Sequence, residues 1–331
     1  MFEQQTCLIT GGTGSWGHEL TRKLLNLSQP PKEIRIFSRN EYAQVQMQRA
    51  FPADAPLSFV IGDVRDGNAL MEACKGVDYV FHLAALKHVP ICEKQPLEAL
   101  KTNVTGTKNV IQASIANKVK KVIDVSTDKA VDPINFYGMT KAIGEKLILH
   151  ANHDSEFTKF VCIRGGNVLG TNGSVVPLFK QQIQTTGRLQ LTDRRMTRFF
   201  LTVSEAIDLL LTAAEVALGG ETFVMKMKSC KIEDLANVMA KQLSQKRVPI
   251  TEIGVRPGEK LHEVLVSRQE ALHTYVYSDQ YYVILPTHGF EDLQEVYRHY
   301  QPATFVEYDS NAGLLKKPAI EAMLRTGGFL S

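Results

Sequence analysis

The chain has 331 residues, of which 44% are hydrophobic and 22% are charged, as is typical of a globular protein large enough for two lobes. Its formal net charge is only +3 and it has no long run of Lys or Arg, so the composition does not favour a nucleic-acid partner. The sequence begins with no signal peptide and contains no run of about 20 apolar residues. We therefore expect a cytoplasmic protein without a membrane partner.

The predicted elements of the first half alternate between short apolar runs and longer amphipathic runs. Strands are predicted over 7–10, 34–37, 58–62, 79–84, 121–126 and 160–165. Helices are predicted over 15–28, 41–50, 66–75, 93–116 and 135–152. Nearly continuous apolar strands suit a parallel sheet with helices on both faces. The pattern therefore predicts an α/β fold, a Rossmann-like doubly wound parallel sheet, for residues 1–165.

After residue 165 the elements become shorter and their composition more mixed. We expect a helix that begins at Ser204 as its N-cap, followed by a strand over 222–227. The segment 200–226 is expected to return to the first domain. The remaining segments, 166–199 and 227–331, are predicted to form a smaller α/β substrate-binding lobe and a tail.

A glycine-rich loop, TGGTGSWG (10–17), follows the first predicted strand and opens the first predicted helix. Glycines at this spacing permit a tight turn and let the backbone approach a pyrophosphate, which then lies at the helix N-terminus. No G-K-[ST] follows, so a P-loop is not predicted. The expected cofactor contacts in this loop are Gly11, Thr13, Gly14, Ser15, Trp16 and Gly17.

The end of the second strand, IFSRNE (36–41), bears on the choice of dinucleotide. An acidic residue there would bind the ribose 2′-hydroxyl of NAD, whereas Ser38, Arg39 and Asn40 suit a 2′-phosphate. We therefore predict NADP, with NAD as the less favoured cofactor. Further cofactor contacts are expected after the third and fourth strands, at Asp63, Val64, Ala84, Ala85 and Lys87.

The segment DVSTDKAVDPINFYGMTK (124–141) concentrates reactive side chains. Tyr137 and Lys141 lie one turn apart on the predicted helix, where the ammonium would lower the pKa of the phenol and make it a usable base. Asp128 and Lys129 are adjacent at the end of a strand. Neighbouring side chains on an extended segment point in opposite directions, so a simple ion pair between these two is not expected.

These motifs, together with VFHLAALKHVP, KTNVTGTKNV, STDKA and RPGEKLHE, resemble the extended short-chain dehydrogenases/reductases that act on nucleotide sugars. Within that family the chain is most similar to inverting UDP-N-acetylglucosamine 4,6-dehydratases of pseudaminic acid and capsular polysaccharide pathways. The resemblance covers nearly the whole chain. Two departures are Trp16, where the family has Phe, and IRGGNV (163–168), where related chains have RYGNV.

The resemblance implies roles for the reactive side chains. Tyr137 would accept the proton of the C4 hydroxyl, which Thr127 or Ser126 would orient, while hydride leaves C4. Lys129, as a neutral amine in the bound complex, would then remove the C5 proton, and a protonated Asp128 would protonate the departing C6 hydroxyl. Asn103 and Lys141 are expected to contact the cofactor.

The resemblance also implies how a UDP-sugar would be held. The expected substrate contacts are Lys87, Asn167, Val175, Val176, Pro177, Thr192, Met196, Arg198, Arg256 and Glu259. Arg194 and Arg195 precede Arg198 but are less favoured. Like others in the family, the protein is expected to form a homo-oligomer, a dimer or a hexamer.

Several alternatives remain open at this point. The product could be the uninverted 4-keto sugar or a 5,6-ene, and a nucleotide-sugar 4-epimerase would need Tyr137 but leave Lys129 without a role. A non-catalytic dinucleotide-sensing protein is the alternative from another class. Metal is not predicted, because the spacing of His82, His88 and His262 matches no standard zinc site and the five cysteines lack paired spacing.

Overall fold

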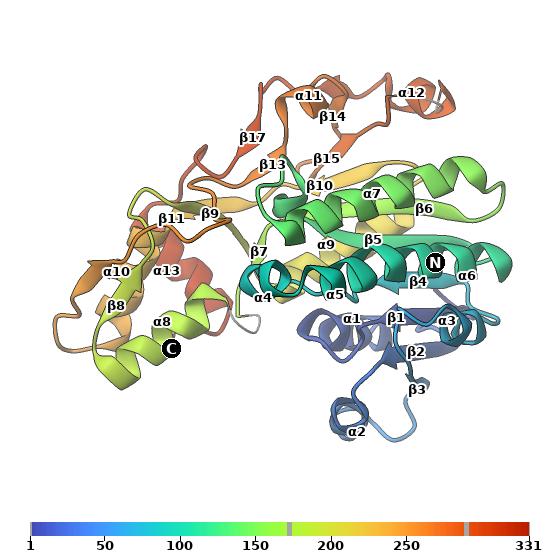
Figure 1. Ribbon diagram of the computed structural model, residues 1–331, viewed down its shortest axis with the longest axis horizontal. Coiled ribbons are helices and arrows are strands. Elements are labelled where there is room, and N and C mark those ends of the chain that lie inside the picture. The colour runs from blue at the N-terminus through green and yellow to red at the C-terminus, as the bar shows by residue number, and fades with distance from the viewer. Residues whose placement is uncertain (1, 171–173, 288–290, 331) are drawn as a thin grey trace.

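The computed structural model describes residues 2–170, 174–287 and 291–330 (Figure 1). Within these ranges the chain forms a large lobe around a ten-stranded sheet and a smaller lobe that contains two shorter sheets. None of the helices in these ranges has the length and apolar character required to cross a bilayer.

Seven neighbouring strands of the large sheet are parallel, in the order β3-β2-β1-β4-β5-β6-β10. They are β1 (Thr6–Thr10), β2 (Glu33–Ser38), β3 (Leu57–Ile61), β4 (Tyr79–His82), β5 (Lys121–Thr127), β6 (Lys159–Gly165) and β10 (Thr222–Met225). The chain proceeds outward from β1 in both directions, which makes the edge between β1 and β4 the topological switch point. The predicted doubly wound sheet is confirmed.

Helices cover both faces of this sheet, and neighbouring residues of one strand enter different cores. Leu8 packs in the core that contains Ile148, whereas Ile9 packs in the core that contains Leu20 and Ile207. Figure 1 shows α6 and α7 in front of the sheet and α9 behind it. The helices of this lobe are α1 (Ser15–Leu25), α2 (Glu41–Arg49), α3 (Gly67–Ala73), α6 (Gly106–Ala116), α7 (Phe136–Asp154) and α9 (Val203–Val216).

The segment predicted as one helix over 93–116 is interrupted. It consists of α4 (Val89–Lys94), α5 (Pro96–Leu100), a π-helical turn (Lys101–Thr105) and α6. The break falls at Gln95, whose backbone leaves the helical region (φ −131°, ψ 61°) before Pro96. Proline has no N–H to continue a helix and restricts the residue before it, which explains the break.

The N-cap of helix α9 lies two residues before the predicted cap. Thr202, not Ser204, is its N-cap: Thr202 accepts from the backbone N–H of Glu205, and the Glu205 carboxylate accepts from the backbone N–H of Thr202. This reciprocal pair is a capping box, which a single Ser cannot provide. The helix packs against α1, where Lys23 Nζ lies 2.7 Å from Asp208 Oδ1, and leads into β10 beside β6.

Part of the C-terminal region extends the large sheet, contrary to the prediction that 227–331 forms only the second lobe and tail. Strand β15 (Tyr281–Ile284) pairs antiparallel with β10, β14 (Thr274–Val276) pairs with β15, and β16 (Gln301–Pro302) pairs with β14. These strands are short and antiparallel. They do not alternate with helices as the parallel strands do, so the sequence pattern did not reveal them. Two short helices flank them, α11 (Arg268–Ala271) and α12 (Glu291–Tyr297).

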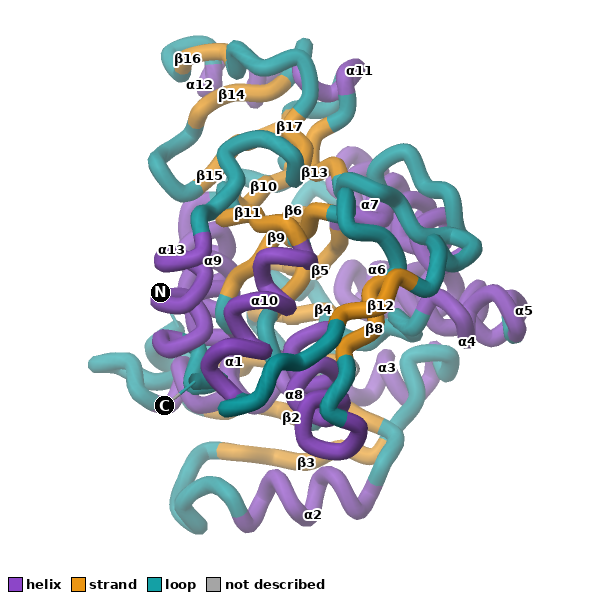
Figure 2. The backbone as a smooth tube through the Cα atoms, turned by 90° about the vertical axis from the view of Figure 1, so that its left-hand side faces the viewer, coloured by secondary structure: helices purple, strands orange, loops and turns teal. Residues whose placement is uncertain are grey.

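The smaller lobe, seen from its own side in Figure 2, has a separate apolar core that includes Phe179, Leu235 and Leu324. Its helices are α8 (Val175–Thr186), α10 (Ile232–Leu243) and α13 (Lys317–Thr326). Its strands are β7 (Asn167–Val168), β8 (Leu189–Leu191), β9 (Thr197–Leu201), β11 (Lys228–Lys231) and β12 (Ile250–Glu252). The two-stranded sheet of β13 (Val264–Val266) and β17 (Tyr308–Asp309) packs against the core of the large lobe, in which Leu265 and Val266 are buried.

Candidate active site

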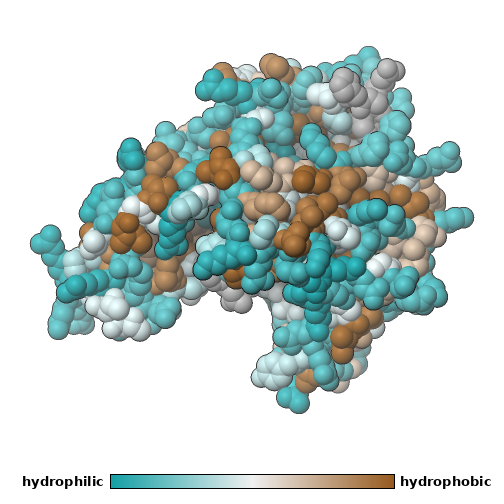
Figure 3. All heavy atoms as spheres, in the orientation of Figure 1, coloured by the Kyte–Doolittle hydropathy of each residue, from teal (hydrophilic) through white to brown (hydrophobic). Residues whose placement is uncertain are grey.

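A cavity of about 790 Å³ lies between the two lobes, at the carboxyl ends of the parallel strands. Its walls come from the loops that follow β1 to β5 on one side and from α8, β9 and residues 256–263 on the other. The space-filling view shows the surface hollowed between α8 and the lower part of the large lobe (Figure 3). Ligands of open α/β sheets bind at this edge, beside the switch point.

The glycine loop between β1 and α1 forms a cradle that larger residues would fill. Gly11 has φ +65°, and a Cβ on it would lie 2.9 Å from the backbone nitrogen of Ala84. A Cβ on Gly17 would overlap the carbonyl oxygen of Gly12. Gly14 caps α1 without a side chain, so the first N–H groups of the helix remain available to an anion. A pyrophosphate therefore fits this loop, and all six predicted loop residues line the cavity.

The loops after β2 and β3 contribute the next part of the wall. Ser38 Oγ accepts from Gln44 Nε2 at 3.0 Å, and Asn40 Oδ1 caps α2 by accepting from a backbone N–H. The Arg39 guanidinium is 56% exposed and lies 3.9 Å from the nearer Asp63 carboxylate oxygen. Arg39 is therefore the residue of the predicted trio whose side chain remains most available to a phosphate. Val64 lines the same wall.

Asn103, which is predicted to contact the cofactor, is not part of the cavity wall in this structure. It is 2% exposed, and its amide bonds both backbone groups of Leu86 at 2.8 and 2.9 Å and donates to Thr140 Oγ1 at 3.0 Å. Asn103 therefore fastens the loop after β4 to α7. That loop presents Lys87 to the cavity, where burial lowers the pKa of its ammonium. The loop's other predicted residues, Ala84 and Ala85, also line the wall.

Tyr137 and Lys141 both line the cavity from α7. Lys141 Nζ lies 3.3 and 3.5 Å from the two carboxylate oxygens of Asp124, a fully buried residue of β5. Burial opposes the ammonium of Lys141, but Asp124 outweighs this and raises its pKa. The predicted low pKa of the phenol is wrong for this state: burial raises the pKa of Tyr137 and outweighs the opposing effects of Lys141 and Lys129.

His82 lies near this pair, and each of its two ring nitrogens has a hydroxyl group as its hydrogen-bond partner. Its Nδ1 lies 2.7 Å from Thr10 Oγ1 and its Nε2 lies 3.2 Å from Thr107 Oγ1. Burial lowers the pKa of His82 to about 4, so the ring is neutral at physiological pH. Among the residues that the structure describes, no group of three or more His, Cys, Asp or Glu side chains is arranged to hold a metal ion.

A single 3-10 turn, Asp128–Ala130, brings the adjacent acid and amine together after β5. Lys129 Nζ lies 3.0 Å from Asp128 Oδ1, which also accepts from Thr127 Oγ1 at 2.8 Å. The expectation that the two side chains diverge is wrong, because the backbone turns here instead of remaining extended. Thr127 and Lys129 line the cavity, whereas Asp128 is fully buried behind them and is not part of the wall.

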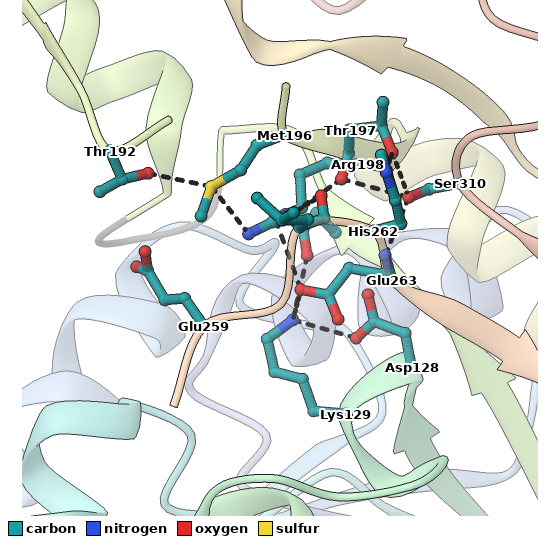
Figure 4. Close-up of polar contacts among 12 residues, drawn as sticks. Asp128, Lys129, Thr192, Met196, Thr197, Arg198, Glu259, His262, Glu263 and Ser310 are labelled. Carbon is teal, nitrogen blue, oxygen red and sulfur yellow. Dashed lines mark hydrogen bonds and ion pairs between the residues drawn. The ribbon is translucent and has the colours of Figure 1, made fainter. Parts of the chain in front are cut away.

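A carboxylate that the sequence analysis missed, Glu263, faces Lys129 from the other side of the cavity floor (Figure 4). Its Oε1 lies 3.5 Å from Lys129 Nζ and 3.4 Å from Arg198 Nε. Burial opposes the ammonium of Lys129, but Asp128 and Glu263 together raise its pKa above the usual value. In this structure Lys129 is therefore an ammonium, and the neutral amine expected in the bound complex requires the loss of a proton. The signal for Glu263 was present in RPGEKLHE, but its partner Arg198 is 65 residues earlier in the sequence.

The small lobe lines the opposite end of the cavity with most of the predicted substrate residues. Arg198 is held in place by carbonyl groups, since its Nη1 donates to Thr197 O at 2.7 Å. Arg194 pairs with Glu233 and Arg195 pairs with an aspartate, and neither arginine is part of this wall. The predicted residues that line the wall are Asn167, Val175, Val176, Thr192, Met196, Arg198, Arg256 and Glu259.

Pro177 is the exception among the predicted substrate residues. It is not part of the cavity wall, whereas Leu178 and Phe179 are. The cause is that Val175, Val176 and Pro177 form the first turn of α8, which begins at Val175. On a helix only some residues of a turn can face one side.

The chain is similar to proteins of known family. The family model described as "Polysaccharide biosynthesis protein" matches residues 7–285. A relative from Campylobacter jejuni subsp. jejuni serotype O:2, named UDP-N-acetylglucosamine 4,6-dehydratase (inverting), is 45% identical over 295 residues, which cover 88% of this chain and 86% of the relative. A relative from Rickettsia akari, named UDP-glucose 4-epimerase, is 46% identical over 274 residues, which cover 82% of this chain and 80% of the relative.

Solved structures of other proteins have the same fold as this chain. Pen from Bacillus thuringiensis superposes with a TM-score of 0.92 at 36% identity, and the match covers 100% of both chains. DesIV, a dTDP-glucose 4,6-dehydratase from Streptomyces venezuelae solved with NAD bound, has a TM-score of 0.71 at 25% identity, covering 78% of this chain and 87% of that one.

The doubly wound sheet, the glycine cradle and the Tyr137–Lys141 pair define an extended short-chain dehydrogenase/reductase, which confirms that prediction. Within this class, the chain belongs to the polysaccharide biosynthesis protein family.

Proposed function

We propose that the protein is an NADP-dependent UDP-N-acetylglucosamine 4,6-dehydratase that inverts C5. The observation that carries this proposal is the placement of Lys129 in the cavity wall, 3.0 Å from Asp128 and 3.5 Å from Glu263. An amine at this place gives the site a base for a carbon acid, which oxidation and reduction at C4 alone do not require. The relative named as an inverting dehydratase supports the substrate.

The residues around the glycine cradle fit a nicotinamide dinucleotide. The loop and the N-terminus of α1 would hold its pyrophosphate, and Lys141 would reach its ribose. Arg39 supports NADP, because no acidic residue at the end of β2 opposes a 2′-phosphate. When bound, the nicotinamide supplies a reversible hydride acceptor. The protein must supply everything else, which is the orientation of the sugar and the movement of its protons.

Tyr137 is the proposed base for the C4 hydroxyl. Lys141 and Lys129 both favour the phenolate, while burial opposes it, so closure of the site around a substrate must shift this balance. Thr127 lines the cavity beside Tyr137 and can orient the same hydroxyl. Once C4 is a ketone, the C5 proton becomes acidic.

Lys129 is the proposed base at C5, and Asp128 is its proton partner. An ammonium 3.0 Å from a carboxylate can become an amine beside a carboxylic acid when one proton moves between them. This transfer would supply both the base for C5 and the acid for the C6 hydroxyl without a change in the number of protons. Asp128 is fully buried, so its proton must reach the sugar through Thr127 or Lys129 or after a local rearrangement.

The second candidate function is a nucleotide-sugar 4-epimerase, which the relative named UDP-glucose 4-epimerase favours. The identities of 45% and 46% do not separate the two activities. Lys129 supports the dehydratase over the epimerase, because epimerisation at C4 removes no proton from C5.

Proton NMR of the product separates the candidates. The enzyme is incubated with NADP and either UDP-N-acetylglucosamine or UDP-glucose. We expect UDP-N-acetylglucosamine to give a 4-keto-6-deoxy sugar with a C6 methyl group and inverted configuration at C5. A C4 epimer with its C6 hydroxyl intact would instead establish the epimerase, and retained configuration at C5 would refute inversion. Tyr137→Phe, which removes only the phenolic oxygen, is the control for contaminating activity.

A further inference from the structure

Glu263 precedes β13 and is 3% exposed, yet it contributes to the wall of the cavity. One of its carboxylate oxygens, Oε1, serves both Lys129 and Arg198, at 3.5 and 3.4 Å. The other, Oε2, is buried and has no hydrogen-bond partner among the described residues. A buried ionisable group costs stability unless it is well paired, so this incomplete pairing indicates a functional role.

We propose that Glu263 is a positioning residue for Lys129, which it ties across the cavity floor to Arg198 of the proposed substrate site. The inference rests on the proposed function, since Lys129 is the proposed base. The inference adds Glu263 to the candidate active site, where no role has been assigned to it above.

The charged and titratable groups that face Lys129 come from four elements. Asp128 approaches from the 3-10 turn, Arg198 from β9, Tyr137 from α7 and Glu263 from the segment before β13. Asp128 and Glu263 favour the ammonium, whereas Arg198 opposes it. The charges of two carboxylates, Asp128 and Glu263, therefore offset those of two cations, Lys129 and Arg198, at the cavity floor. Of the two carboxylates, Glu263 is the one that pairs with both cations.

The C-terminal tail holds Glu263 in place, which gives this part of the chain a role. Ser310 follows β17 and is fully buried. Its backbone N–H donates to Glu263 O at 2.8 Å, and its Oγ accepts from the Glu263 N–H at 2.9 Å. The same hydroxyl lies 2.7 Å from Thr197 Oγ1 on β9, the strand that carries Arg198. The backbones that present the two partners are thus joined by one side chain (Figure 4).

The test measures the amine of Lys129 directly. Wild type, Glu263→Gln and Glu263→Asp are treated with acetic anhydride over a range of pH, and acetylation of Lys129 is followed by peptide mass spectrometry. Only the free amine reacts, and a nearby opposite charge shifts a pKa by about 1–3 units. We therefore expect Lys129 in Glu263→Gln to react at least about tenfold faster at a given pH. Glu263→Asp, which keeps the charge, should remain close to wild type.

Glu270→Gln is the matched control. Glu270 is a carboxylate of the same region, paired with the buried Arg164 at 3.0 Å and outside the cavity wall. Its loss should leave the reactivity of Lys129 unchanged. Equal rates in wild type and Glu263→Gln would overturn the proposal, as would equal acceleration by Glu270→Gln, which would indicate general loosening. Circular dichroism melts verify that each variant is folded. No substrate is needed, so this test can fail or succeed whether or not the dehydratase activity is found.

Discussion

Replacement of Lys141 by Met should destabilise the protein strongly, because it leaves Asp124 as a buried charge without a partner. The side chains of Lys141 and Asp124 are 5% and 0% exposed, and Nζ lies 3.3 Å from the nearer oxygen. At this distance and an effective dielectric constant of about 20, the attraction is on the order of 5 kcal/mol. Removal of one member of a buried pair costs about 3–5 kcal/mol. We expect a loss of this size in the free energy of unfolding.

The double variant Asp124→Asn/Lys141→Met should recover most of this loss, leaving about 1–2 kcal/mol, because no unpaired charge remains. Urea unfolding followed by circular dichroism measures both variants. The pKa of Lys141 is raised above its ordinary value of 10.5, so the contribution of the pair is complete below that pH and is lost only as pH rises through the higher folded value. The difference between variants should therefore be constant from about pH 7 to 9. A single variant within about 1 kcal/mol of wild type, or a double variant no better than the single, would refute the reasoning.

Three further predictions follow from the cavity and the residues beneath it. His82, neutral in the fold with a pKa of about 4, binds a proton more readily when unfolded, so stability should fall by about 3 kcal/mol as pH drops from about 6.5 to 4; His82→Gln should flatten this part of the stability curve. Arg39→Ala should weaken NADP binding at least tenfold and leave NAD binding nearly unchanged, as read from the fluorescence of Trp16, the single tryptophan of the chain. Gly17→Ala should abolish dinucleotide binding and lower the free energy of unfolding in urea by about 1–3 kcal/mol, because its Cβ would overlap the Gly12 carbonyl; equal binding by mutant and wild type would contradict the cradle.

The parallel half of the fold could be predicted because each of its signals is local. Apolar runs of four to seven residues and glycines at fixed spacing report strand, turn and helix without reference to distant residues. The exceptions have local causes too. Pro96 divides a predicted helix, and Thr202 displaces Ser204 as a cap because it forms the reciprocal pair with Glu205.

From spacing alone, the reactive side chains of the candidate site could be predicted where one segment carries them. Residues 124–141 supply Lys129, Tyr137 and Lys141 to the same wall. The carboxylates that pair with these lysines could not be assigned from spacing. Glu263 lies 134 residues after Lys129 in the chain, and Asp124, which pairs with Lys141, is fully buried. Lys141 lowers the pKa of the Tyr137 phenol as predicted, but burial raises it by more, and burial is a property of the whole fold that spacing does not report.

Lys129→Ala tests the central claim most directly. The variant and wild type are incubated with NADP and UDP-N-acetylglucosamine in deuterated water, and NMR follows solvent deuterium at C5 and the appearance of the C6 methyl group. We predict that the variant forms neither signal at a measurable rate, while the fluorescence of Trp16 still reports NADP binding. Wild-type rates of deuterium incorporation and methyl formation in Lys129→Ala would contradict the assignment of this amine as the base.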